Sequence, residues 1–493
     1  MLESFLRGAA ALWDGDVIAA VAVAVSIGTV VGLLPGLGGV FALAIMIPFV
    51  YGMDPLQGLV FLLSAHAVIN TSGAITTIVL GIPGSPGCAA TLLDGFPLAQ
   101  AGRAGVAIGA ALAASAIGGV FGAVVLIALI PVLQQVALLF GSPELFALTL
   151  MGVLALGALS GDSMAKGLIA GALGMFLATF GYQQITAVPR FWFGSDYLLD
   201  GFRLVPLILG LFSIPEILEL LRGERVAAAG PGNAVSAKDI ADGFAVTVKK
   251  WRLLLQSSTI GVLVGIAPGI GGETAGFLAY ALAKRTSRSG STFGRGAIEG
   301  VIAPESSNNS KEGGALVPTL AFGVPGSAGM AVLLGGFLVL GLEPGPYFLD
   351  RHLDVAMAMA LALAIANLAG VLILLPAIGL IAKVTLIRGP LLAPILLVFV
   401  LAGAYATSHH LMDVASMIAF GALGYAMKRL GYSRPALLLG FVLAPIIERY
   451  AHISLQAYGP GFMLRPIVLT LGGIMLLILC WPLLRKLASG RRT

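Results

Sequence analysis

The chain has 493 residues, of which 58% are hydrophobic and only 10% are charged, so an ordinary soluble globular protein is excluded. Its net charge of +5 comes from basic residues gathered in a few short loops, a distribution typical of membrane proteins and not of nucleic-acid binding. The two cysteines, Cys88 and Cys480, lie in apolar surroundings and give no support to a disulfide framework or a thiolate metal site.

Apolar runs recur along the whole chain and predict an all-α polytopic membrane protein of roughly 11–14 segments. The charged residues before the first run make a poor signal peptide, so we expect an uncleaved first span. In the first half the runs cover 17–34, 40–51, 56–80, 89–93, 104–140, 144–160, 164–181 and 204–221. In the second half they cover 353–384, 391–406, 411–428, 435–447 and 466–484.

A polar stretch divides these runs into two groups. Residues 222–252 are rich in Lys and Arg, and we expect them to form a cytoplasmic connecting loop. We therefore predict a first membrane repeat over 1–221 and a second over 253–493.

Two glycine- and proline-containing phrases occur once in each half. The sequence GLLPGLGG at 32–39 returns as GIAPGIGG at 265–272, and GIPGSPG at 81–87 returns as GVPGSAG at 323–329. The offset is 233 residues for the first phrase and 242 for the second, and this slow growth predicts one duplicated plan. The first phrase has acidic flanks (Asp14, Asp16, Asp54) and its copy has basic flanks (Lys250, Arg252, Lys284), which predicts inverted topology.

These phrases are the candidate binding site, because Pro and Gly break helices and free backbone groups inside the membrane. Helix N-termini can then bind an anion, and freed carbonyls can bind a cation. The alternative is a helix kink or a close helix crossing. The candidates from the phrases are Pro35, Gly36, Gly38, Gly39, Pro83, Gly84, Ser85, Pro268, Gly269, Gly271, Gly272, Pro325, Gly326 and Ser327.

Polar side chains beside the breaks complete the candidate site. Asn70, Thr71 and Ser72 interrupt an apolar run, and Asn308 and Asn309 belong to the polar cluster 306–310. Their oxygens and amides suit Na⁺ or a carboxylate. The alternatives are interhelical hydrogen bonding for the first group and a capped surface loop for the second. Glu273 either binds a cation or proton, or caps the following helix.

Other ionisable residues receive simpler interpretations. We expect His66 to be a hydrogen-bonded structural residue, although proton coupling is an alternative. Glu305 and Glu312 are expected to be solvated, and Arg434 to be a topology anchor. The competing functional class is an intramembrane hydrolase, which would have to use Asp162, or His409 with Asp413. A passive channel is a third functional class. The sequence contains no metalloprotease, nucleophile-elbow or ATP-binding motif.

Several distinctive ungapped phrases then identify a family. They are ATLLDGFPLA at 90–99, FGRGAIEG at 293–300, PESSNNS at 304–310, GGALVP at 313–318 and GLEPGP at 341–346. In these phrases the chain resembles the large membrane subunit of the tripartite tricarboxylate transporters, the TctA family. It departs from the family at Thr71-Ser72-Gly73, where members often have Gly-Gly-Ser, and at Lys311, where they often have a small residue.

The resemblance implies a bacterial inner-membrane permease for tricarboxylates or other carboxylates. Transport would be symport with Na⁺ or H⁺, without a cofactor and without a metal beyond a possible Na⁺. The implied partners are a small four-span membrane subunit and a periplasmic solute-binding protein, with a possible homodimer of the two-subunit membrane complex. An elevator-type mechanism is implied by analogy. The basic residues at both ends of the second copy separately suggest a re-entrant hairpin that enters and leaves the membrane on one side.

Overall fold

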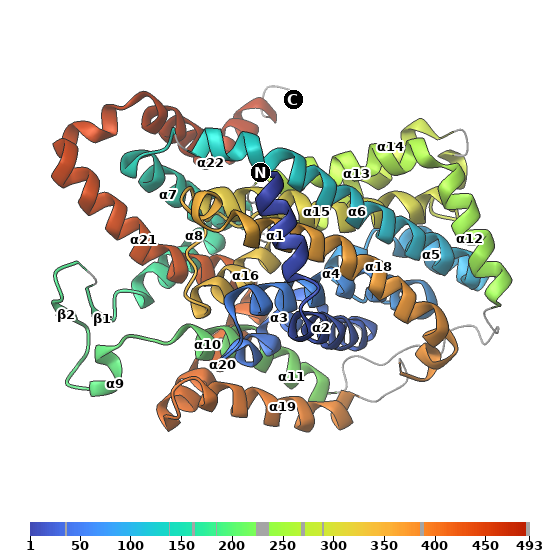
Figure 1. Ribbon diagram of the computed structural model, residues 1–493, viewed down its shortest axis with the longest axis horizontal. Coiled ribbons are helices and arrows are strands. Elements are labelled where there is room, and N and C mark those ends of the chain that lie inside the picture. The colour runs from blue at the N-terminus through green and yellow to red at the C-terminus, as the bar shows by residue number, and fades with distance from the viewer. Residues whose placement is uncertain are drawn as a thin grey trace.

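The computed structural model describes residues 1–34, 37–137, 139–159, 163–183, 185–222, 236–267, 272–287, 290–384 and 389–489. These residues are almost entirely helical, apart from one short antiparallel hairpin of β1 (Gly181–Tyr182) and β2 (Pro189–Arg190) (Figure 1). Among the described residues, seven helices are long and apolar enough to cross a membrane. The prediction of an all-α polytopic membrane protein is therefore confirmed.

The first part of the chain contains many helices of unequal length. They are α1 (Leu2–Ala11), α2 (Gly15–Leu33), α3 (Gly38–Met46), η1 (Ile47–Val50), α4 (Pro55–Leu80), η2 (Pro86–Cys88), α5 (Leu92–Gln100), α6 (Ala104–Ala137), α7 (Ser142–Leu159), α8 (Met164–Leu177), α9 (Asp196–Leu199), α10 (Leu204–Ile208), η3 (Leu209–Ser213) and α11 (Ile214–Leu221).

The second part begins with a helix inside the polar stretch. Its helices are α12 (Ala237–Lys249), α13 (Trp251–Ile266), α14 (Gly272–Thr286), η4 (Gly290–Thr292), α15 (Glu299–Phe322), α16 (Ala328–Val339), α17 (Phe348–Arg351), α18 (Leu353–Val384), α19 (Gly389–Ala406), α20 (Leu411–Leu430), α21 (Arg434–Tyr458), η5 (Gly459–Leu464) and α22 (Pro466–Ser489).

The helices end at the glycine-proline phrases, as predicted. Helix α2 ends at Leu33 and α3 begins at Gly38, and α13 ends at Ile266 before α14. Helices α4 and α15 both end on a glycine in the left-handed region, Gly81 with φ of 69° and Gly323 with φ of 67°. Glycine adopts this conformation without the steric cost that a side chain brings.

The structure excludes one alternative for the second half and contradicts one expectation. The polar sequence around 306–310 does not form a surface loop, because it lies in the middle of α15, where nearly every residue is buried. Glu305 and Glu312 are 0% and 2% exposed, so they are not solvated. Their carboxylates accept hydrogen bonds from neighbouring segments of the chain, so they need no water molecule as a hydrogen-bond donor.

Helices α4 and α15 have matching surroundings. Helix α4 packs against α2 and α18, and α15 packs against α13 and α6. In both crossings glycine permits close backbone contact: a Cβ at Gly28 would lie 2.6 Å from the Ala65 carbonyl oxygen, and one at Gly261 would lie 2.3 Å from that of Ser307. Small residues at such crossings are typical of membrane helix packing.

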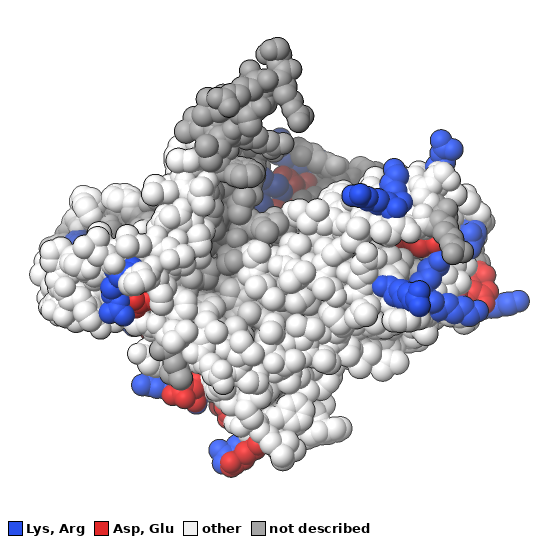
Figure 2. All heavy atoms as spheres, turned by 90° about the horizontal axis from the view of Figure 1, so that it is seen from above, with Lys and Arg blue, Asp and Glu red and all other residues white. Residues whose placement is uncertain are grey.

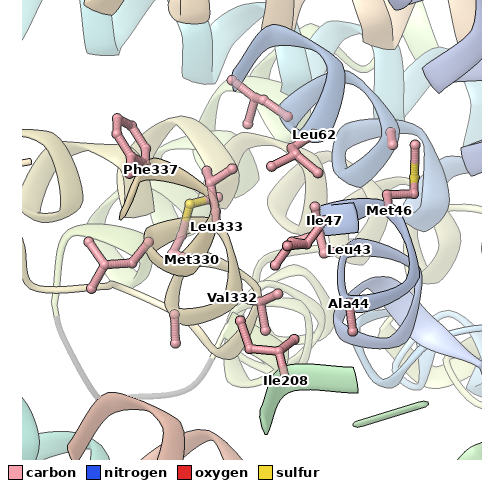
Figure 3. Packing of buried hydrophobic residues seen from close by; sticks show 14 of the residues in the cluster. Leu43, Ala44, Met46, Ile47, Leu62, Ile208, Met330, Val332, Leu333 and Phe337 are labelled. Atoms are coloured by element: carbon pink, nitrogen blue, oxygen red, sulfur yellow. The ribbon is translucent and has the colours of Figure 1, made fainter. Parts of the chain in front are cut away.

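The short helices that follow two of the breaks pack together in the core. Figure 3 shows Leu43 of α3 and Ile47 of η1, which continues α3, facing Leu333 and Met330 of α16, with Leu62 of α4 alongside. All five side chains are fully buried. This contact places the N-terminal ends of α3 and α16 at one common region of the molecule.

The outer parts of the molecule differ from this core. Helices α7, α8, α21 and α22 form one end in Figure 1, and the β1–β2 hairpin and α9 project from that end. Figure 2 shows that charged side chains on the viewed face gather near its edges and leave a broad uncharged area between them. Such an area suits contact with lipid.

Candidate functional site

A cavity of about 240 Å³ lies where the broken helices meet. Its walls come from the first residues of α3, the turn around η2, the first residues of α16, and the middle of α4 and α15. The polar or backbone-exposing residues that line it are Gly38, Gly39, His66, Asn70, Ser85, Gly87, Glu216, Lys311, Glu312, Ser327, Gly329 and Arg434. The cavity therefore joins elements from both predicted halves of the chain.

Two helix N-termini open into this cavity. Helix α3 begins at Gly38, and α16 begins at Ala328 after its N-cap Ser327, whose hydroxyl accepts from the Met330 amide at 3.2 Å. The first amides of a helix lack intrahelical partners and carry partial positive charge. Two such ends beside one cavity form an environment suited to an anion.

A buried charged group lines the same cavity. Glu312 lies 3.4 Å from Lys311 Nζ and 3.1 Å from His66 Nε2, and it accepts a hydrogen bond of 3.2 Å from the Asn70 amide. Ser85 in turn donates to Asn70 Oδ1 at 3.1 Å. Glu312 is therefore compensated by several donors, and it holds Lys311, His66 and Asn70 in place around the cavity.

The His66 ring lies between the starts of the two short helices. A Cβ at Gly39 would lie 2.8 Å from His66 Nδ1, and a Cβ at Gly329 would lie 2.3 Å from Cε1. Only glycine leaves room for this approach, since even an alanine would overlap the ring. Within the described residues, Nδ1 has no hydrogen-bond partner although it is buried. His66 is thus hydrogen-bonded through Nε2, as predicted, and it lies directly at the cavity.

The opposite wall carries a second set of charges. Arg434 at the start of α21 lies 3.3 Å from Glu216 of α11 and donates to the Leu211 carbonyl at 3.2 Å. Its guanidinium also lies over the Phe212 ring, 5.6 Å from the centroid. Glu216 is bound in addition by Lys428 at 2.8 Å. Arg434 is therefore part of the cavity wall as well as a basic residue near a helix end.

The predicted site residues divide into three groups. Gly38, Gly39, Asn70, Ser85 and Ser327 line the cavity. Pro35, Gly36, Pro268, Gly269 and Gly271 lie outside the described residues, as does the side chain of Glu273. Gly272 begins α14.

The third group lies near the cavity but does not line it. Ser72 bonds to backbone carbonyls of its own helix, and Gly84 packs against Gly73, where an added Cβ would meet the backbone at 2.5 Å. Gly326 packs against the Gly265 carbonyl in the same way, at 2.4 Å. Pro83 and Pro325 precede Ser85 and Ser327 in the two turns.

The two asparagines of α15 also have structural neighbours. Asn309 donates to Thr71 Oγ1 at 2.8 Å and to Asn367 Oδ1 at 2.6 Å, so it joins α15 to α4 and α18. Asn308 lies against Gly87, where a Cβ would be 2.3 Å from its Oδ1. For Thr71 and Asn309 the structure favours interhelical hydrogen bonding, the alternative stated for Thr71.

Sequence reasoning did not assign Lys311, Glu312, Gly87, Gly329 or Phe41 to the site. Gly87 and Gly329 stand at the ends of the repeated second phrase, so their repetition was an available signal. Lys311 was noted only as a departure from the family pattern. No feature of the sequence showed that Lys311 and Glu312 are buried.

Of the residues considered for a hydrolase, Asp413 belongs to a polar cluster elsewhere, whereas His409 packs against the Tyr405 ring. Asp413 accepts from Tyr197 at 2.8 Å and from Ser408, and His410 stacks on the Tyr197 ring and caps α20. Desolvation raises the pKa of Tyr197 to about 12, so the phenol stays protonated and keeps donating at neutral pH. These contacts tie α9 to α20. Asp162 lies outside the described residues.

Comparison with known proteins gives a family match. A family model described as "Tripartite tricarboxylate transporter TctA family" matches residues 18–439. An uncharacterized 52.8 kDa protein of Agrobacterium vitis, in the TAR-I ttuC' 3' region, is 32% identical over 472 residues, 95% of this chain and 93% of that protein. An uncharacterized protein in the TAR-II ttuC' 3' region of the same organism is 36% identical over 234 residues, 47% of this chain and 97% of that protein. No solved structure matches the chain.

Proposed function

Because this chain belongs to the tripartite tricarboxylate transporter TctA family, and is a transporter subunit and not an enzyme, we propose that it imports tricarboxylates or other carboxylates by Na⁺- or H⁺-driven symport. The cavity described above would hold the substrate carboxylate. The proposal places no resident cofactor or metal in the site; a Na⁺ bound there would be a transported ion.

One observation carries this proposal: Lys311, two helix N-termini and the hydroxyls of Ser85 and Ser327 line a single cavity. Each of these groups favours a negatively charged or hydrogen-bond-accepting ligand. Glu312 would neutralise part of the positive charge when the cavity is empty. A carboxylate that enters the cavity would compete with Glu312 for Lys311. Substrate binding would therefore weaken the ion pair between Glu312 and Lys311.

The size of the cavity also fits a small organic acid better than a larger ligand. Its volume of about 240 Å³ is below the range of roughly 300–1,000 Å³ that is usual for drug-sized ligands. Phe41 and Phe212 supply apolar contact beside the polar groups. Lys311 stands where members of the family that the chain resembles often have a small residue, so we do not restrict the proposed substrate to citrate.

We further propose that the two halves are inverted repeats. Two contacts support this: Gly87 lies against Asn308, and Gly329 lies against His66. Gly329 follows Gly87 by 242 residues, and Asn308 follows His66 by the same interval. Each half thus places the glycine of its second phrase against the long helix of the other half, as a two-fold arrangement requires. An elevator-type movement of these broken helices would be the transport step.

The proposed setting is the bacterial inner membrane. The chain would work with a small four-span membrane subunit and a periplasmic solute-binding protein that delivers the carboxylate, and the two-subunit membrane complex would form a homodimer. The family description supports partner subunits, since it names a tripartite transporter.

The test is uptake into proteoliposomes that contain the chain with its partner subunits. Na⁺ and H⁺ gradients are imposed separately, with radiolabelled citrate and other carboxylates as substrates. We expect saturable uptake that requires the binding protein and one gradient. Uptake without saturation, independent of both, would instead indicate a passive channel and reject the proposal.

A further inference from the structure

Glu305 is a second buried carboxylate, outside the cavity walls. It lies on α15 with 0% exposure. Its Oε1 accepts from the Thr91 hydroxyl, and its Oε2 accepts from Ser115 at 3.2 Å. The three residues come from α15, from the segment between η2 and α5, and from α6. Glu305 therefore joins three separate elements through hydroxyl contacts alone.

Glu305 differs from Glu312 in how its charge is compensated. Glu312 has Lys311 and His66 within 3.4 Å, whereas no basic nitrogen in the described part of the chain lies within 4.0 Å of Glu305. A buried carboxylate without a counter-charge is costly, because two hydroxyl donors replace little of its hydration. The neutral, protonated acid avoids this cost.

The surroundings of Glu305 favour a proton over a metal cation. Helix α15 packs too closely here to leave much space: a Cβ at Gly118 of α6 would lie 2.2 Å from the carbonyl oxygen of the neighbouring Ser306. Two hydroxyls and one carboxylate also supply fewer oxygen ligands than the roughly six that a hard cation takes. A proton needs neither additional ligands nor a cavity.

The other ionisable groups near Glu305 are few. Lys311, two turns along α15, and the Cys88 thiol interact with it electrostatically. Helix α6 contains no ionisable side chain. On the remaining neighbours, His66 of α4 is bonded to Glu312, Tyr280 of α14 is bonded to Asp94, and Arg252 of α13 and Lys284 and Arg285 of α14 lie near helix ends.

We propose that Glu305 is an exchangeable proton-binding site that couples transport to a proton gradient. The proposal rests on the proposed transport function and names the coupling ion. A proton from water bonds to one carboxylate oxygen on one side of the membrane, and the same O–H bond breaks on the other side to return the proton to water. Because Thr91 follows the broken 81–87 segment, a movement of that segment would change the donors around Glu305 and so its affinity for the proton.

The first experiment compares the wild-type complex with Glu305→Gln, which mimics the protonated acid. With an inward pH difference of about one unit, one coupled proton supports about tenfold accumulation of substrate. Glu305→Gln should lose this accumulation and its dependence on external pH, while exchange of internal for external substrate falls much less. The exposed Glu3→Gln on α1 should behave as wild type.

The outcomes separate the two proposals. Proton-driven accumulation by Glu305→Gln at the wild-type level, or wild-type accumulation driven by Na⁺ alone, overturns the role of Glu305. Wild-type protein that transports no carboxylate under any gradient overturns the proposed function instead.

A second measurement needs no transport. Infrared difference spectra of the purified wild-type complex should show a protonated-carboxyl band that titrates and is missing in Glu305→Gln. If Glu305→Gln does not assemble, the same spectra are recorded for Thr91→Val. In that variant the carboxylate loses a hydrogen-bond donor, so the pH at which half of the band has disappeared should be higher. An unchanged spectrum in whichever variant is measured overturns the proposal.

Discussion

His66 and Glu312 are 246 residues apart in the sequence, yet His66 Nε2 lies 3.1 Å from a carboxylate oxygen of Glu312. The pair joins the middle of α4 to the middle of α15, and both side chains are buried. It therefore connects the long helices that precede the two copies of the second phrase. The substrate cavity that we propose is built around this connection.

Replacing Glu312 by Gln should destabilise the protein strongly. The change leaves Lys311 buried without its carboxylate, and breaking a buried ion pair in this way costs about 3–5 kcal/mol. The double variant Glu312→Gln with Lys311→Met should recover much of this loss, because no uncompensated charge remains. Thermal unfolding in detergent measures both effects. Equal unfolding temperatures for the single and double variants would show that the two residues are not coupled.

Adding a methyl group on either side of His66 should strongly reduce transport. Gly39→Ala and Gly329→Ala place a Cβ 2.8 Å and 2.3 Å from the ring, so the ring or a short helix must move. We expect the uptake rate to fall by at least about tenfold. An increase of only about 1.4 kcal/mol in the free-energy barrier of transport is enough for this. Gly472→Ala on α22 is the matched control, since a Cβ there meets nothing within 4 Å. Full activity of both cavity variants would contradict the assigned geometry.

The repeated phrases made part of this fold predictable. A single proline is not sufficient, because Pro131 and Pro376 lie inside the unbroken helices α6 and α18. Pro and Gly together, in a phrase that occurs in both halves, indicate Gly81 and Gly323 as break points without any tertiary information. The same phrases identified Gly38, Gly39, Ser85 and Ser327 as cavity residues. These predictions needed only local backbone physics and the repeat.

The polar part of α15 was not predictable in the same way. Average hydropathy cannot distinguish a polar segment in water from one whose partners are supplied by distant helices. Glu312 is satisfied by His66 and Asn70, and Glu305 by Thr91 and Ser115, all more than 100 residues away. Only the tertiary structure brings these donors together, so burial of α15 could not be inferred from its sequence.

Asp94 should be important for stability and not for substrate binding. Its Oδ1 accepts three hydrogen bonds of 2.8 Å from the amides of Gly294, Gly296 and Ala297, and its Oδ2 accepts one from Tyr280. Gly294 and Gly296 have φ of 84° and 102°, which lets the amides turn toward one carboxylate. The clamp fixes α5 to the segment that leads into α15.

Asp94→Ala should therefore lower the free energy of unfolding by more than Tyr280→Phe does. Hydrogen bonds to a charged group contribute about 1.5–3 kcal/mol each, and Asp94→Ala removes four whereas Tyr280→Phe removes one. Unfolding in detergent gives the comparison, and the substrate KM of the folded fraction should stay at the wild-type value. A larger effect of Tyr280→Phe would contradict the clamp.

Ser85→Ala and Asn309→Ala should separate substrate binding from helix packing. Ser85 lines the cavity and donates to Asn70, so its loss should raise KM by about five- to tenfold, the effect of about 1–1.5 kcal/mol for one hydrogen bond. Asn309 lies outside the cavity and joins α15 to Thr71 and Asn367, so its loss should lower the unfolding temperature and leave KM unchanged. Uptake kinetics and thermal unfolding on the same preparations test both statements. If Asn309→Ala raised KM while keeping full stability, Asn309 would belong to the substrate-binding site, and its assignment to helix packing alone would be wrong.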